Sequence, residues 1–239
     1  MGPETKFQPT VAALEKIAGR IDGLILASPS NPVGAVIPAA DLAALAAWCS
    51  GRGIRLISDE IYHGITYGAP ATTAAALGGE AVVINSFSKY FSMTGWRLGW
   101  LVLPPDLARG VERLAQNLFI SPPTLSQHAA IAAFDAHDEL ALNVRRYAAN
   151  RDLLLNDLPG AGFSKLTSTD GAFYIYADVG DLTDDSLAFC TRMLEETGVA
   201  ATPGIDFDAA RGRHFLRFSF AGATADMAEA AKRLKAWGK

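Results

Sequence analysis

The sequence predicts an α/β fold, in which part of a mostly parallel sheet is covered by helices and a smaller α+β domain follows at the C-terminal end. Short apolar runs alternate with longer helical patterns through the first half of the chain, which is typical of βαβ units. The second half changes to single strands separated by helices. Half of the 239 residues are apolar, so a sizeable core can be buried.

The first half contains four predicted strands and two predicted helices. The strands are the apolar runs at residues 23–28, 55–61, 81–86 and 98–103. An Ala- and Leu-rich helix is expected at 38–49, because Pro38 suits a first helical turn and Gly51 follows the last turn. A second helix is expected at 106–117, and the pair Pro122-Pro123 then breaks the chain.

The second half begins with helices and continues as a small α+β pattern. Residues 127–158 predict a helix, a turn near His137 and a long amphipathic helix that ends before Pro159. The later elements are expected as a strand at 171–178, a helix at 184–197, a strand at 214–220 and a helix from Thr224. This order predicts two domains, residues 1–136 and residues 137–239, with the linking helix near residue 145 as a hinge in the second.

Composition and charge favour a small-molecule partner. The formal net charge of -4 provides no field that attracts nucleic acid or an anionic membrane. Cys49 and Cys190 lie in separate helical stretches, which argues against disulfides or a thiolate metal site and fits a reducing cytoplasm. The first residues lack the apolar run of a secretory signal, and no run is long enough to span a bilayer. The four histidines have no metal-ligand spacing, so no metal site is expected.

Residues 86–99, SFSKYFSMTGWRLG, carry the most chemistry. They begin at the end of a predicted strand, where open α/β sheets place ligands. An aldehyde cofactor needs a lysine amine with which to form an imine, and Lys89 is suited to that role. A phosphate group needs hydroxyls and a fixed cation, and Ser86, Ser88 and Arg97 provide them. Singly, these residues are typical of solvated charges and turns, so their combination carries the prediction.

The order Ser-x-Ser-Lys, with an arginine eight residues after the lysine, resembles the pyridoxal-phosphate (PLP) attachment signature of the class I/II aminotransferases, which have the fold type I. The resemblance implies that Lys89 holds PLP as a Schiff base and that Ser86, Ser88 and Arg97 bind its phosphate. It also implies that residues 1–136 are what remains of the large PLP-binding domain.

A carboxylate motif, LISDEIY, ends the predicted strand at 55–61. Asp59 and Glu60 face opposite sides of an extended chain, so only one of them can reach a given ligand. The segment resembles the family's Asp-Glu-Ile-Tyr, which implies that Asp59 pairs with the pyridine nitrogen of PLP and that Tyr62 bonds the ring hydroxyl. The alternative is structural, with Asp59 or Glu60 capping a helix and Tyr62 in the core.

Two further residues are expected to bind substrate. The loop Ser-Pro-Ser-Asn31-Pro-Val-Gly resembles the family's Ser-Pro-x-Asn-Pro-Thr-Gly, with Val33 in place of threonine, and implies that Asn31 contacts both the ring oxygen and the substrate carboxylate. Arg217 lies on a strand face opposite Leu216 and Phe218, where a lone arginine among aromatics needs an anion. Its place resembles that of the family's carboxylate-binding arginine, and a structural ion pair is the alternative.

The likeness covers essentially all of the chain in the family's order. It implies a homodimer that moves an amino group between an amino acid and a 2-oxo acid, with Lys89 as the acid and base. The cysteine usage adds the expectation that the protein is cytoplasmic. The family's long N-terminal portion is missing before the segment at residues 2–5, so the sequence is expected to be an N-terminally truncated member and an incomplete, inactive fragment is one alternative. Others are a carbon-sulfur lyase, an aminocyclopropane synthase-like enzyme, and a non-catalytic sensor domain.

Overall fold

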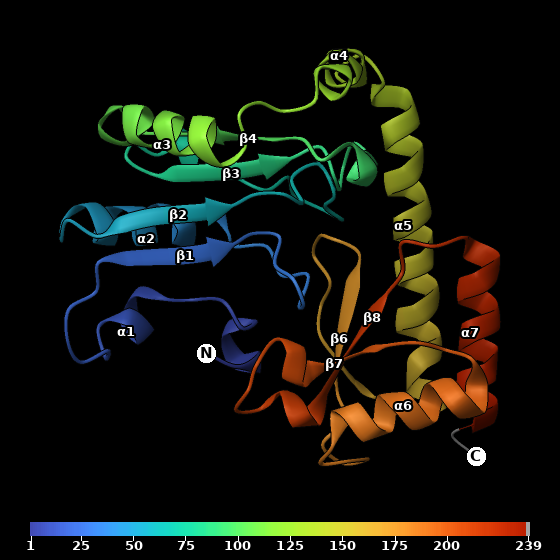
Figure 1. Ribbon diagram of the computed structural model, residues 1–239. Coiled ribbons are helices and arrows are strands. Elements are labelled where there is room, and N and C mark those ends of the chain that lie inside the picture. The colour runs from blue at the N-terminus through green and yellow to red at the C-terminus, as the bar shows by residue number, and fades with distance from the viewer. Residues whose placement is uncertain (238–239) are drawn as a thin grey trace. The chain divides into compact units, whose positions relative to one another are not determined.

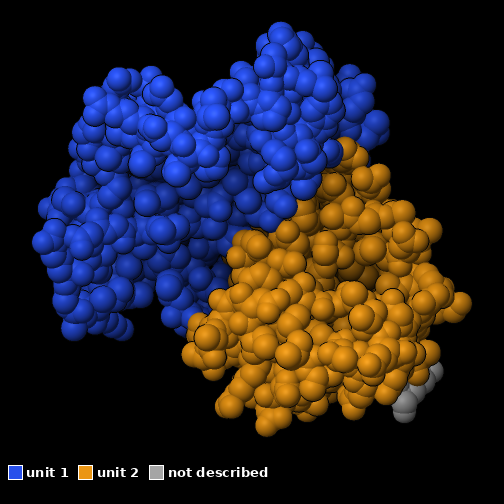
Figure 2. All heavy atoms as spheres, viewed as in Figure 1, with its two compact units in different colours: residues 1–30, 36–142 blue, residues 31–35, 143–239 orange. Residues whose placement is uncertain are grey.

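The computed structural model describes residues 1–237 and contains two compact units (Figure 2). Unit 1 comprises residues 1–30 and 36–142, and unit 2 comprises residues 31–35 together with the chain from 143 onward. The expected division into domains 1–136 and 137–239 stays a prediction, and its last two residues lie outside the described part. No sequence pattern predicts that residues 31–35 belong to the second unit.

Unit 1 is built on one four-stranded sheet, in the order β1-β2-β3-β4. Its strands are β1 (Gly23–Ala27), β2 (Arg55–Asp59), β3 (Val82–Ser86) and β4 (Gly99–Val102). The first three run parallel and β4 runs antiparallel to β3 (Figure 1). Asp59 pairs with Ile84 and Ser86 with Gly99, so the carboxyl ends of β2 and β3 lie side by side.

The helices of unit 1 range from one turn to several turns. They are α1 (Val11–Leu14), α2 (Ala39–Ser50), α3 (Pro105–Leu118), α4 (Thr124–Ala133) and the first part of α5 (His137–Asp157). The main core forms where α2 packs on one face of the sheet, and it includes Leu26, Leu42, Leu45, Trp48, Leu56 and Val83. In β2, the buried residues Leu56 and Ser58 alternate with half-buried ones, as one buried sheet face requires.

The opposite face of this sheet carries exposed apolar side chains. Ile25 is 72% exposed and Leu101 is 46% exposed, although both lie within strands. Apolar strand residues of this kind normally pack against a second layer. Among the described residues, this face is therefore incompletely covered.

Unit 2 contains a second, antiparallel sheet in the order β5-β6-β8-β7. Its elements are the rest of α5, then β5 (Lys165–Leu166), β6 (Tyr174–Asp178), α6 (Ser186–Thr197), β7 (Thr202–Pro203), β8 (Phe215–Ser219) and α7 (Thr224–Trp237). Its fully buried side chains include Leu158, Phe163, Ile175, Met193, Leu216 and Leu234. Asn150 in α5 is also buried and donates hydrogen bonds to the carbonyls of Phe220 and Gly222, both at 3.0 Å, which ties α5 to the chain after β8.

The predicted α/β class and mostly parallel sheet are confirmed, and most element boundaries differ by one to three residues. The strand predicted at 171–178 begins at Tyr174, because the residues before it form a turn. The predicted alternation of β8 is also confirmed, since Leu216 and Phe218 are buried while Arg217 is half-buried. Within residues 1–237, no helix is long and apolar enough to cross a bilayer.

Candidate active site

Lys89 lies in a turn that follows β3, and an aromatic cluster anchors that turn. The ring of buried Phe87 contacts Phe91, Trp100 and Phe134, with centroid distances of 4.8, 5.0 and 5.5 Å. Lys89 is half-buried, and its Nζ is 5.8 Å from the ring centroid of Tyr62. The turn after β3 therefore presents its amine to the turn after β2.

A glycine allows these two turns to pack closely. Gly64 follows Tyr62 and has a φ of +90°. A Cβ atom at Gly64 would lie 2.5 Å from the ring of Tyr90, which is closer than any real contact. Because Tyr90 is the neighbour of Lys89, this packing helps to fix the position of Lys89 relative to Tyr62.

The predicted phosphate-binding residues form a connected loop. The hydroxyls of Ser86 and Ser88 are hydrogen-bonded at 2.9 Å, and Ser86 Oγ accepts the Ser88 N–H at 3.0 Å. Thr94 donates to the Ser88 carbonyl at 2.6 Å, and Arg97 donates to the Thr94 carbonyl at 2.8 Å. Arg97 is exposed and adopts a left-handed conformation with a φ of 51°. Two hydroxyls and a guanidinium are thus carried by one short hydrogen-bonded segment.

The neighbouring carboxylates Asp59 and Glu60 have different surroundings. Glu60 is 2% exposed and accepts hydrogen bonds from the Ser58 hydroxyl at 3.0 Å and the Ala74 N–H at 2.7 Å. His63 Nδ1 lies 3.4 Å from its second oxygen. These contacts give Glu60 a structural role and leave Asp59 as the carboxylate available for a ligand.

Asp59 is half-buried at the end of β2 and accepts one hydrogen bond, from the Ile61 N–H at 3.1 Å. Burial raises the pKa of its carboxyl, and the charge of Glu60 raises it further, although the Ile61 N–H acts in the opposite direction. A cationic group beside Asp59 would offset this cost. The chain forms turns after Asp59 and no helix, so neither carboxylate caps one, while Tyr62 is buried, as the structural alternative for it requires.

These residues fit the chemistry of PLP. A half-buried carboxylate suits a protonated pyridine nitrogen, an amine suits an aldehyde, and hydroxyls with a guanidinium suit a phosphate. All of them come from the carboxyl ends of the neighbouring strands β2 and β3 or from the turns that follow, which is the expected place for a ligand in such a sheet.

In unit 2, Asn31 and Arg217 are brought together across 186 positions of sequence. Arg217 donates from Nη1 to the Asn31 side-chain oxygen at 2.6 Å and from Nη2 to the Thr202 hydroxyl at 3.1 Å. Its guanidinium carbon also lies over the rings of Tyr174 and Phe207, at 4.3 and 4.8 Å from their centroids. Within residues 1–237, Arg217 forms no ion pair with an acidic side chain, contrary to the structural alternative.

The loop at 31–35 is held in unit 2 through its backbone. The carbonyl of Gly34 accepts the N–H groups of Asp170 and Gly171, at 2.9 and 2.8 Å. The Thr167 hydroxyl donates to the Val33 carbonyl at 3.3 Å. These contacts place Asn31 beside Arg217 and make the loop part of the same unit as β8.

Sequence reasoning missed three neighbours of Arg217. Thr202 pairs with Arg217 across β7 and β8, and Tyr174 lies on the adjacent strand β6. Phe207 follows β7 along the chain. The only available signal was an arginine among aromatics, because strand pairing over such distances cannot be read from one sequence.

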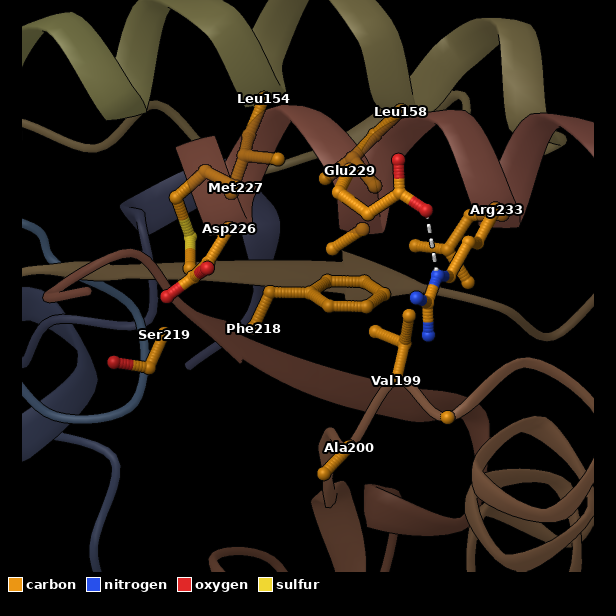
Figure 3. Close-up of a pocket in the computed structure, with 13 residues that line it drawn as sticks. Leu154, Leu158, Val199, Ala200, Phe218, Ser219, Asp226, Met227, Glu229 and Arg233 are labelled. Atoms are coloured by element: carbon orange, nitrogen blue, oxygen red, sulfur yellow. Dashed lines mark hydrogen bonds and ion pairs between the residues drawn. The ribbon is translucent and has the colours of Figure 1, made fainter. Parts of the chain in front are cut away.

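Unit 2 also contains a separate hollow of about 320 Å³, which includes none of the predicted site residues (Figure 3). Its floor is apolar, from Leu154, Leu158 and Phe218, and its rim carries the ion pair between Arg233 and Glu229 at 2.9 Å.

Comparisons with known proteins identify the family of the chain. The family model for aminotransferase class I and II matches residues 2–234. A valine–pyruvate aminotransferase of Mycobacterium tuberculosis is 54% identical over 99% of this chain and 62% of its own length. A (5-formylfuran-3-yl)methyl phosphate transaminase of Methanocaldococcus jannaschii is 33% identical, over 95% of this chain and 60% of its own length.

Solved structures give the same result. The crystal structure of an aminotransferase from Mycobacterium tuberculosis matches 99% of this chain and 62% of its own, with a TM-score of 0.96 and 54% identity. Aspartate aminotransferase from Thermus thermophilus with maleate matches 99% of this chain and 62% of its own, with a TM-score of 0.89 and 31% identity. The chain thus spans about 62% of the length of such relatives.

Proposed function

Because the chain belongs to the class I and II aminotransferase family, we propose that it forms part of a PLP-dependent aminotransferase, which moves an amino group between an amino acid and a 2-oxo acid. Enzymes of this family depend on PLP. The observation that carries the proposal is the amine of Lys89, which faces Tyr62 beside the strand end that carries Asp59. This is the arrangement that an aldehyde cofactor with a basic ring requires.

When bound, PLP supplies an aldehyde carbon that links to amines and a ring that withdraws electrons. Lys89 would hold the cofactor, and its amine would move a proton to and from the substrate Cα. Asp59 would keep the ring nitrogen protonated through its negative charge, and Tyr62 would bond to the ring hydroxyl. Ser86, Ser88 and Arg97 would bind the phosphate.

Substrate binding falls to residues of unit 2. Arg217 would bind the substrate carboxylate through its guanidinium, which the Asn31 side chain orients. Asn31 would also contact the cofactor ring. The support for this role is a half-buried arginine whose hydrogen-bond partners, Asn31 and Thr202, are both neutral. Its positive charge is therefore available to an anion.

We extend the proposal to the substrate class. The 54% identical relative is a valine–pyruvate aminotransferase, so we propose a branched apolar amino acid as donor and pyruvate as acceptor. The expected result is faster conversion of the cofactor to its amine form with valine than with aspartate, followed by absorbance. Release of ammonia in place of that conversion would point to a lyase.

Lys89 is tested by trapping. With PLP and borohydride, the wild-type chain should retain the cofactor covalently, whereas Lys89→Ala should retain none. Lys165→Ala is the matched control, because Lys165 is an exposed lysine paired with Asp181 at 2.7 Å. Mass spectrometry of tryptic peptides measures the label. Equal labelling of wild type and Lys89→Ala would overturn the assignment.

We also propose that the enzyme is a cytoplasmic homodimer. Both cysteines are free and buried, which suits a reducing compartment. Unit 1 exposes several large apolar side chains around α3 and α4, including Leu118, Phe119, Ile120 and Leu125. Apolar groups clustered in this way are typical of an interface. Analytical ultracentrifugation should show a dimer for the wild type and weaker association for Ile120→Glu. A monomeric wild type would contradict the proposed homodimer.

A further inference from the structure

The surroundings of Arg217 restrict how an anion can approach it. The guanidinium carbon lies 4.3 Å from the ring centroid of Tyr174 and 4.8 Å from that of Phe207. Tyr174 is buried in the sheet and Phe207 is half-buried in the chain after β7. Two rings at these distances crowd the guanidinium and leave little space beside it for a bulky anion. The edge that carries the terminal nitrogens is therefore the part to consider for an incoming anion.

Burial decides which edge is reachable. Nε of Arg217 is fully buried and has no hydrogen-bond partner within the described residues. The terminal nitrogens bond to Asn31 and Thr202, and Asn31 is exposed. Each terminal nitrogen carries two hydrogens, so each retains one donor beyond the bond it already makes. The terminal edge is thus the one that a ligand from solvent meets first.

The nearby acidic side chain does not occupy this edge. Asp208 follows Phe207 along the chain, and its oxygens accept from the side chain and the backbone of Arg211, at 2.9 and 3.0 Å. Within residues 1–237, the hydrogen-bond partners of Arg217 are the uncharged side chains of Asn31 and Thr202. The edge of Arg217 that carries Nη1 and Nη2 therefore keeps its positive charge and its remaining N–H donors, which lie in the guanidinium plane.

We infer that Tyr174 and Phe207 make Arg217 selective for a planar carboxylate over tetrahedral oxyanions. A carboxylate can lie in the guanidinium plane and accept from both terminal nitrogens. A phosphonate or sulfonate also places oxygens above and below that plane, so it needs more space than a carboxylate does beside the two neighbouring rings. The inference rests on the proposed role of Arg217 as the carboxylate-binding residue and adds Phe207 as a specificity-determining residue.

The test compares two anions of equal charge. Pyruvate is planar at its carboxylate, and the monomethyl ester of acetylphosphonate is singly charged and tetrahedral. Both are titrated into the 239-residue chain while the Arg217 Nε–Hε signal is followed by NMR. We expect wild type to bind pyruvate at least about tenfold more tightly. Phe207→Ala should reduce this ratio to within about threefold, mainly by improving the binding of the tetrahedral anion.

Four further variants separate the possible failures. Phe207→Tyr keeps the ring and should keep the wild-type ratio, and Arg233→Gln, which removes an arginine outside the site, should bind both anions as wild type does. Thr202→Val should weaken the binding of both anions equally, because it removes a hydrogen bond that holds the guanidinium but keeps both neighbouring rings. An unchanged ratio in Phe207→Ala overturns the selectivity inference. Equal pyruvate binding by wild type and Arg217→Gln, or no shift with pyruvate, overturns the proposed role of Arg217 itself.

Discussion

At the scale of single residues, the pair Asp59 and Glu60 separates stability from function. Glu60 accepts two hydrogen bonds and faces His63, so its burial is compensated. Asp59 accepts one, and its burial raises the pKa of the carboxyl. A carboxylate held in an unfavourable state by its own fold is typical of a ligand-binding position.

Replacement of Asp59 by asparagine should therefore stabilise the chain in the absence of cofactor. The folded pKa of Asp59 is raised, so the folded state binds the proton more tightly than the unfolded state does. The stability that protonated Asp59 contributes is fully present below the pKa it has in the unfolded state. That stability is lost as the pH rises through the pKa it has in the folded state. Asp59→Asn should raise the free energy of unfolding at pH 7 and leave it unchanged at low pH, where Asp59 is protonated. The increase should be about 1 kcal/mol or less, because the side chain is partly exposed. Urea unfolding at several pH values measures this.

The neighbouring residue supplies the control for that experiment. Glu60→Gln should destabilise the chain by about 1–3 kcal/mol, because it replaces the buried carboxylate oxygen that faces His63 Nδ1 with an NH2 group, while the oxygen that accepts from Ser58 and Ala74 is kept. PLP titration followed by absorbance should show weakened binding in Asp59→Asn. A less stable Asp59→Asn at neutral pH would show that Asp59 has a structural role.

At the scale of elements, the sequence predicts what depends on local pattern. The apolar runs around Leu26, Leu56 and Val83 become the parallel strands, because each is short, apolar and followed by turn residues. The apolar runs that form β2 and β3 also predict where two site residues lie, because Asp59 ends the first run and Lys89 follows the second. The alternation that separates Leu216 from Arg217 is also local.

Elements that depend on distant pairing were not predicted. β5 and β7 contain two residues each, so they have no period that a sequence pattern can reveal. The position of Thr202 beside Arg217 exists only because β7 pairs with β8. The attachment of residues 31–35 to unit 2 depends on backbone hydrogen bonds to Asp170 and Gly171, which have no side-chain signature.

The loop at 31–35 makes a prediction about Gly34. Its φ is +74°, and a Cβ atom would lie 2.8 Å from the Gly171 carbonyl oxygen and 3.2 Å from that of Tyr174. Gly34→Ala should therefore destabilise unit 2 by about 2–4 kcal/mol and displace Asn31 from Arg217. Thermal unfolding measures the loss, and the NMR signal of Arg217 reports the displacement.

Gly53 is the matched control for this substitution. It also has a positive φ, +65°, but no atom lies within 4 Å of a Cβ built there. Gly53→Ala should cost only the conformational strain, about 1 kcal/mol, and leave the Arg217 signal unchanged. Equal losses in the two variants would show that the close packing of Gly34 contributes nothing.

At the scale of the whole molecule, the two units have separate cores. The core of unit 1 forms between α2 and its sheet, with Leu45 at 1% exposure. Unit 2 buries Leu216 completely within a different sheet. The proposed chemistry is divided in the same way, since Lys89 and Asp59 belong to unit 1 while Asn31 and Arg217 belong to unit 2.

Separate cores predict that each unit opens on its own. Leu45→Ala and Leu216→Ala each remove a buried side chain, at a cost of about 2–5 kcal/mol. Hydrogen exchange should therefore speed up in β1, β2 and β3 for the first variant and in β6 and β8 for the second, while the other sheet exchanges as in wild type. If either variant accelerated exchange equally in both sheets, the units would unfold as one cooperative body. Lys89 and Asp59 in unit 1 and Asn31 and Arg217 in unit 2 would then be exposed by the same unfolding event, with one free energy of unfolding.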